Sequence, residues 1–150
     1  MQTEDYLKAG KIASEVREMV RKKDWIGKTV YEICEEVEGE IKKRGAKCAF
    51  PVNTSINEIA AHYTAEPNDP ITIKDTDLVK IDLGAQVNGY IADTAVTVCY
   101  DAQYDGLVQT AEEALANAMA MIKTGVKASD IGRTIESTIK QKGFKPIANL

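Results

Sequence analysis

Histidine, tryptophan, phenylalanine and cysteine are all scarce in this 150-residue sequence, with one, one, two and three copies. Every role that needs an imidazole therefore falls on His62 or on no residue. Cys34, Cys48 and Cys99 are odd in number and show no Cys-x-x-Cys spacing, which argues against a disulfide framework and against a zinc cluster. We expect three free, mostly packed thiols.

Long apolar runs and an excess of positive charge are also missing. No run approaches the length of a membrane span, and Glu4 and Asp5 stand where a signal peptide has basic residues. A net charge of −4 argues against a nucleic-acid-binding surface. The sequence therefore predicts a cytoplasmic protein with no membrane partner and no direct nucleic acid recognition. Its length predicts one domain over residues 1–150.

Two amphipathic helices are predicted near the N-terminus. Apolar residues at steps of three and four indicate the first over about residues 3–23. Thr29 and Glu32 have the spacing of a capping box, which predicts the start of the second helix. Gly45 lies where a glycine C-cap is expected. We expect these two helices to pack antiparallel.

Two further helices are predicted in the last third of the chain. Apolar periodicity indicates one over residues 107–122, with Gly125 at its end. Ser129 is expected to cap the other, which Gly143 closes. Residues 144–147 have the pattern of a strand that is beginning.

The composition changes from Lys47, and the sheet region is expected to begin there, because Pro51 cannot continue a helix. Residues 55–62 fit either a short helix or a strand, and the local pattern leaves the choice open. A turn cluster follows, after which residues 71–73 alternate like a strand. The expected order is helix, helix, three strands, helix, helix: an α+β domain with helices on one side of an antiparallel sheet.

A β-hairpin is predicted over residues 78–100, because Asn88-Gly89 lies between two β-rich apolar runs and both residues tolerate positive φ in a type I′ turn. A two-residue loop makes Asp82 and Asp93 diagonal neighbours on one face. Their Cα atoms would lie roughly 7–8 Å apart. Their carboxylates can then converge on one point.

The pair Asp82 and Asp93 is a candidate cation site. Two aspartates on one sheet face repel each other unless a cation lies between them. Gly84 would lie opposite Asp93 and Ala95 opposite Asp82, and both leave room for an ion. Two alternatives remain open: a solvated face with ordinary surface charges, and a carboxyl pair that shares one proton. His62 is also ambiguous, since a lone histidine is more often structural or exposed than functional.

Two motifs resemble methionine aminopeptidase, in the type 2 form of archaea and eukaryotes. The first, at residues 50–64, reads FPVNTSINEIAAHYT, and the second combines KIDLG at 80–84 with NGYIADT at 88–94. The resemblance covers essentially all 150 residues. It implies the N-terminal half of a pita-bread (creatinase/aminopeptidase) fold and makes the segment before His62 a strand. It also implies a cytoplasmic hydrolase that removes the initiator methionine from nascent proteins.

The resemblance assigns roles to four residues. Asp82 would ligate one of two divalent metal ions and Asp93 would bridge both, with cobalt, manganese, iron or zinc all compatible with carboxylate oxygens. His62 would be a catalytic group that hydrogen-bonds the substrate near the scissile amide. Phe50 would form a wall of the pocket for the methionine side chain.

The family's site also needs one more histidine and two glutamates from a C-terminal half, and that half is absent from these 150 residues. We therefore expect the chain alone to be inactive, to bind metal weakly and to self-associate. Expected partners are the N-terminal methionine of peptides or nascent proteins, and the ribosome. Two alternatives remain: a proline-specific peptidase of the same fold, and a non-catalytic relative that acts as a ribosome-associated binding protein.

Overall fold

The computed structural model describes residues 2–147. The chain forms two compact units, and the boundary between them in the sequence lies between Asp101 and Ala102. The first unit contains α1 (Gln2–Lys22), α2 (Val30–Lys43), β1 (Lys47–Cys48), β2 (Asn53–Ile56), β3 (Leu78–Val87) and β4 (Tyr90–Cys99). The second contains the 3-10 turn η1 (Ala102–Tyr104), α3 (Asp105–Met121) and α4 (Ala128–Gln141). Among the described residues, no helix is both long enough and apolar enough to cross a bilayer.

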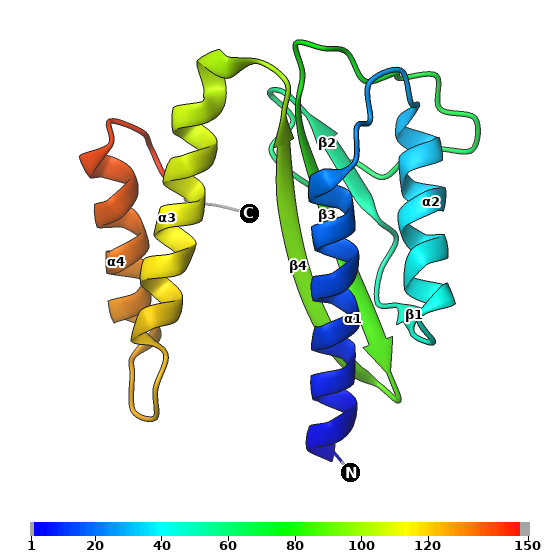
Figure 1. Cartoon of the computed structure of the whole chain (residues 1–150). Helices are drawn as coiled ribbons and strands as arrows, with labels where there is room; N and C mark the ends of the chain where they lie inside the picture. The colour runs from blue at the N-terminus through cyan, green and yellow to red at the C-terminus, as the bar shows by residue number, and fades with distance from the viewer. Residues whose placement is uncertain (1, 148–150) are drawn as a thin grey trace. The chain divides into compact units, whose positions relative to one another are not determined.

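The sheet of the first unit is antiparallel and is built around β3 (Figure 1). β4 pairs along one edge of β3, and β1 and β2 pair with successive parts of the other edge. Helices α1 and α2 run antiparallel and cover one face of this sheet, as predicted. Alternate β3 residues are buried beneath them: Val79, Ile81, Leu83, Ala85 and Val87.

Helix α1 is held to β4 by contacts between distant parts of the sequence. The Arg17 Nη1 donates a hydrogen bond to the Thr94 Oγ1 at 3.1 Å, across 77 positions of the chain. The rings of Tyr6 and Tyr90 meet edge-on, with centroids 6.3 Å apart. The apolar stripe of α1 lies in the core with Trp25, and it contains Ala9, Ile12, Ala13, Val16 and Val20.

The predicted start of α2 is confirmed. The Glu32 amide donates to the Thr29 Oγ1 at 3.1 Å, and the Thr29 amide donates to the Glu32 Oε2 at 2.8 Å. The strand predicted for residues 71–73 is wrong, because this segment forms a single bridge, from Thr72 to Thr29. It pairs with the loop before α2 and does not join the sheet.

The strand expected before His62 is correct only for its first part. β2 ends at Ile56, and residues 57–62 form a turn and irregular backbone. Asn57 ends the strand because it adopts a positive φ of 53°. Its Nδ2 donates to the Asp77 Oδ1 at 2.9 Å, and its Oδ1 accepts from the Leu78 amide at 2.9 Å.

Both helices predicted for the second unit are present, but Ser129 does not cap α4. Lys127 is the N-cap, and no side chain caps this end. The reason lies in the backbone: the amides of Asp130 and Ile131 both donate to the Lys127 carbonyl, so the helix begins two residues before the expected position. Residues 144–147 have no regular structure, and the rest of the predicted strand lies outside the described residues.

Candidate metal centre

The predicted hairpin and its register are confirmed. Asn88 and Gly89 have φ values of 50° and 90°, as a type I′ turn requires. Asp82 pairs with Ala95, and Asp93 pairs with Gly84. The two aspartates are therefore diagonal neighbours on one face of the sheet, the face that α1 and α2 do not cover.

This uncovered face carries most of the candidate site residues. Asp93 is exposed on it, and Asp82 is partly buried. The alternating register places the following residues there: Asn53 and Ser55 of β2, Lys80, Asp82, Gly84 and Gln86 of β3, and Ile91, Asp93, Ala95 and Thr97 of β4. The carboxylate pair thus has one accessible member and one partly sheltered member.

The Asp82 carboxylate has an unsatisfied oxygen. Its Oδ1 is buried and has no hydrogen-bond partner in the described part of the chain. Burial raises the pKa of Asp82, and the adjacent Asp93 raises it further by charge repulsion and by hydrogen bonding, while the charge of His62 acts in the opposite direction. A partly buried carboxylate with one unsatisfied oxygen, beside a second carboxylate, is costly unless a cation compensates it. This observation favours a cation site over a simply solvated face.

His62 lies in the irregular segment after β2, and its charge acts on Asp82. The residue is exposed and adopts a φ of 67°, which is uncommon for a residue other than glycine. The next residue returns the chain to the edge of β2, since the Thr54 amide donates to the Tyr63 carbonyl at 2.7 Å. The imidazole is therefore accessible from solvent, directly before the point where the chain returns to the edge of β2.

Phe50 lies against Gly84 on the same face. A Cβ atom at Gly84 would collide with the Phe50 ring and would come within 2.9 Å of the Ala49 Cβ. The Ala49 amide also donates to the Gly84 carbonyl at 2.9 Å. Because Gly84 is paired with Asp93, the half-buried Phe50 ring forms an apolar surface beside the carboxylates.

The residues present fit part of a metal site. Asp82 and Asp93 offer carboxylate oxygens, one of them unsatisfied, and such oxygens suit divalent cations. Across residues 2–147 there is no group of three or more histidine, cysteine, aspartate or glutamate side chains that could hold a metal ion. Within this range the donor set is therefore two carboxylates, with His62 nearby.

The sequence profile of metallopeptidase family M24 matches residues 4–149. The chain belongs to family M24. Its α+β arrangement is accordingly part of the pita-bread fold, as the sequence motifs led us to expect. The M24 family is one of metallopeptidases, which agrees with a cation site at the paired carboxylates.

Three proteins are similar to this M24 chain in sequence or in structure. A methionine aminopeptidase of Pyrococcus abyssi is 47% identical over 150 residues, which are 100% of this chain and 51% of that protein. The crystal structure of a methionine aminopeptidase from Thermotoga maritima has a TM-score of 0.86 and 31% identity over 95% of this chain and 61% of its own. The prolidase from Pyrococcus furiosus has a TM-score of 0.83 and 28% identity over 94% and 43%. The chain spans about half the length of the curated relatives it matches.

Two features of the site were not predicted from the sequence. Asn53 lies opposite Asp82, with its Nδ2 donating to the Pro51 carbonyl at 2.6 Å, so β2 also contributes to the polar face. Tyr63, the residue after His62, donates a hydrogen bond from its hydroxyl to Asp69. The only sequence signal for Asp69 was its place in a turn-forming cluster, which does not indicate a partner.

Proposed function

We propose that residues 1–150 form the N-terminal half of the catalytic domain of a methionine aminopeptidase, which removes the initiator methionine from nascent proteins. The observation that carries this proposal is the buried, unpaired Oδ1 of Asp82 beside Asp93. Membership of a metallopeptidase family supports it, and so does 47% identity to a protein named methionine aminopeptidase.

Asp82 and Asp93 are the residues that would hold divalent metal in this proposal. Cobalt, manganese, iron and zinc all accept carboxylate oxygen, and the complete enzyme would hold two ions. A bound divalent ion would polarise the carbonyl of the scissile peptide and lower the pKa of a water molecule. The sheltered Asp82 and the exposed Asp93 leave the metal accessible from the uncovered face of the sheet.

His62 and Phe50 are proposed to contact the substrate. The exposed imidazole, whose charge lowers the pKa of Asp82, would donate a hydrogen bond or a proton to a substrate bound at the carboxylates. Phe50 would form an apolar wall for the methionine side chain, because its ring packs on Gly84, directly across from Asp93.

A proline-specific peptidase is the second candidate, and the prolidase from Pyrococcus furiosus, with 28% identity and a TM-score of 0.83, is the observation that favours it. A non-catalytic, ribosome-associated role is disfavoured, since a protein without metal has no use for the costly Asp82–Asp93 pair. The two peptidases differ in the peptides that they cleave, so an assay distinguishes them.

The 150-residue chain is proposed to need a second half. Two carboxylates are too few to hold two metal ions tightly, and the exposed Ile91 and Ala95 beside them would be covered by a partner surface. Alone, the chain would bind metal weakly and would self-associate through this face. Its proposed partners are the N-terminal methionine of nascent chains and the ribosome, in the cytoplasm.

The test joins residues 1–150 to the remaining half of the Pyrococcus abyssi relative, and assays this chimera beside the 150-residue chain with added manganese or cobalt. We expect the chimera to cleave a Met-Ala-Ser peptide at least roughly 10³-fold faster, equivalent to about 4 kcal/mol of barrier. An X-Pro dipeptide serves as the competing substrate. Equal rates from the two proteins would contradict the proposal, and preference for the X-Pro dipeptide would favour the proline-specific alternative.

His62→Ala in the chimera is expected to lower kcat by roughly 10²–10⁴-fold, the usual contribution of a positioned acid or base. The metal content should stay unchanged, because the carboxylates hold the metal. Elemental analysis of the dialysed protein and steady-state kinetics measure the two quantities. A metal content that falls in step with activity would show that His62 is a metal ligand.

A further inference from the structure

A hydrogen-bonded pair that the proposed reaction does not use lies directly after His62. The Tyr63 hydroxyl donates to the Asp69 Oδ2 at 2.6 Å, and the Ile71 amide donates to the Asp69 Oδ1 at 3.0 Å. The Asp69 amide donates to the Glu66 carbonyl at 3.0 Å. Asp69 is only 7% exposed, so this carboxylate is an internal anchor for the loop of residues 64–70.

The backbone of Tyr63 is fixed at the edge of β2. Its amide donates to the Ser55 Oγ at 3.3 Å, and its carbonyl accepts from the Thr54 amide at 2.7 Å. His62 immediately precedes this attachment and has a φ of 67°. A left-handed conformation in a residue other than glycine persists only when the surrounding structure imposes it.

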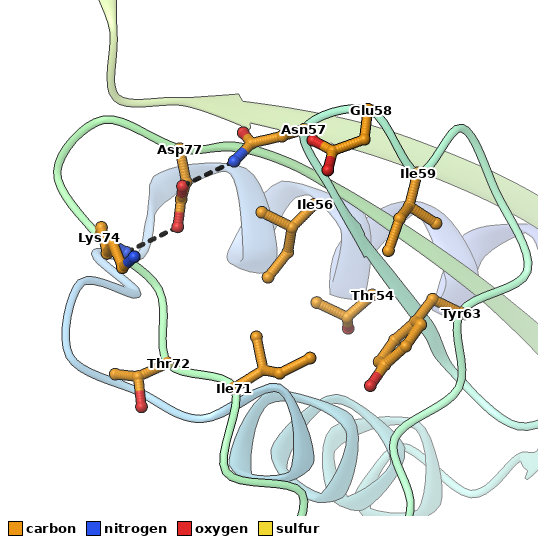
Figure 2. Close-up of a pocket in the computed structure, with 10 residues that line it drawn as sticks. All are labelled: Thr54, Ile56, Asn57, Glu58, Ile59, Tyr63, Ile71, Thr72, Lys74 and Asp77. Atoms are coloured by element: carbon orange, nitrogen blue, oxygen red, sulfur yellow. Dashed lines mark hydrogen bonds between the residues drawn. The ribbon is translucent and has the colours of Figure 1, made fainter.

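Packing does not hold the Tyr63 ring from all sides. The ring lines one pocket of about 360 Å³ and a second of about 370 Å³, and Ile71 lines both. Figure 2 shows the ring at the margin of the first pocket, with Ile56 and Ile71 across the opening. The ring packs against the core on one side and faces open space on another, so the hydroxyl contact with Asp69 adds to this partial packing in fixing its orientation. The same hydrogen bond lowers the pKa of Asp69 and raises the pKa of Tyr63.

We propose that Asp69 is a positioning residue for His62: by holding the Tyr63 hydroxyl, it fixes the turn that keeps His62 left-handed and beside Asp82. The functional meaning of this inference rests on the proposed function, in which His62 contacts the substrate. The contact itself is a property of residues 55–71 and can be measured without any reaction. Asp69 therefore acts through Tyr63 and needs no contact with substrate or metal.

The test uses NMR on the 150-residue chain, where His62 is the single histidine and its signals are unambiguous. The variants are Asp69→Asn, which leaves one acceptor oxygen for two donors, and Tyr63→Phe, which keeps the ring and removes the donor. We expect the His62 amide order parameter to fall from about 0.85 to below about 0.6 in each. The strong intraresidue amide-to-Hα contact of a positive φ should weaken as well. The double variant should be no worse than Asp69→Asn alone, because the Tyr63 hydroxyl acts only through Asp69, whereas Asp69 also accepts from the Ile71 amide.

Two controls separate positioning from general loss of stability. Glu66→Gln changes an exposed carboxylate in the same loop, and Ile33→Val removes a buried methyl group from α2. Both should leave His62 ordered. Ile33→Val serves as the stability control, so its melting temperature is compared with that of Tyr63→Phe. The proposal is overturned if His62 stays ordered in both test variants, or if Ile33→Val disorders it equally.

Activity of the chimera gives a separate reading. Asp69→Asn should lower kcat while metal content stays at the wild-type value, because His62 and not the metal is misplaced. An inactive chimera with a disordered His62 in Asp69→Asn would refute the proposed function and leave the positioning role standing. An active chimera whose kcat is the same with and without Asp69→Asn would refute the positioning role alone.

Discussion

Asp82→Asn is expected to make the 150-residue chain more stable and the chimera inactive. The metal-free chain holds a partly buried carboxylate with an unsatisfied oxygen next to a second carboxylate. An asparagine removes that charge, so the free energy of unfolding should rise by on the order of 1 kcal/mol. The same change weakens the metal site, and hydrolysis of Met-Ala-Ser by the chimera should fall at least roughly 10³-fold, or about 4 kcal/mol.

Urea unfolding of the chain, with and without added manganese, measures the stability. Asp75→Asn is the control, since Asp75 is an exposed carboxylate in a turn and its replacement should change stability by less than about 0.5 kcal/mol. Added manganese should stabilise the wild type more than Asp82→Asn. A loss of stability on Asp82→Asn without metal would show that the carboxylate has a structural partner and would remove the main argument for a cation there.

Gly84→Ala is expected to destabilise the chain and disturb both sides of the proposed substrate site. The new methyl group would overlap the Phe50 ring and lie 2.9 Å from the Ala49 Cβ, and both neighbours flank the strand that carries Asp82. Forcing a methyl group into occupied space typically costs about 1–3 kcal/mol. In the chimera the displaced Phe50 should raise KM for peptides that begin with methionine.

Gly39→Ala provides the matched control for this substitution. Gly39 lies in α2, and a Cβ there meets no atom within 4 Å. Alanine should therefore stabilise the helix by about 0.5–1 kcal/mol. Thermal unfolding of the two variants should move in opposite directions. If Gly84→Ala is as stable as wild type and keeps its KM, the Phe50 ring is free to move and does not form the wall of a defined pocket.

The hairpin could be predicted in full because its determinants are local. Asn88 and Gly89 select a two-residue turn, and that turn fixes which residues of β3 and β4 are opposed. The strict alternation of a strand then places Asp82 and Asp93 on one face. The capping box of Thr29 and Glu32 was predictable for the same reason, since its two hydrogen bonds join residues three positions apart.

The errors occur where distant residues decide the local structure. Asn57 ends β2 because its side chain bonds Asp77 and Leu78, about twenty positions away. Residues 71–73 alternate like a strand, yet their partner is the loop before α2. Neither the hydrophobic periodicity nor the capping residues of the sequence indicate such pairings. Ser129 is a different case, because a good capping residue was present, yet Lys127 is the N-cap and the helix begins at Ala128.

The candidate site was predictable only in part, for a related reason. The carboxylate pair follows from strand parity, whereas the proximity of His62 to Asp82 depends on the turn after β2. The anchor between Tyr63 and Asp69 depends on burial of a carboxylate that stands in a polar, turn-forming stretch. Local composition predicts a solvated loop there, so the role of Asp69 as a buried hydrogen-bond acceptor is evident only from the structure.

The attachment of α1 to β4 has a consequence for synthesis of the protein. Arg17 cannot reach Thr94 until a further 77 residues have been added, and the Tyr6 ring cannot contact Tyr90 until that residue has been synthesised. At about 5–20 residues per second, translation takes roughly 4–15 seconds to supply them. During that interval the apolar side of α1, from Ala9 to Val20, has no sheet to cover it. Helix α1 thus leaves the ribosome well before the sheet that buries it, and its exposed apolar side is a segment through which a nascent chain of this protein would engage chaperones or aggregate.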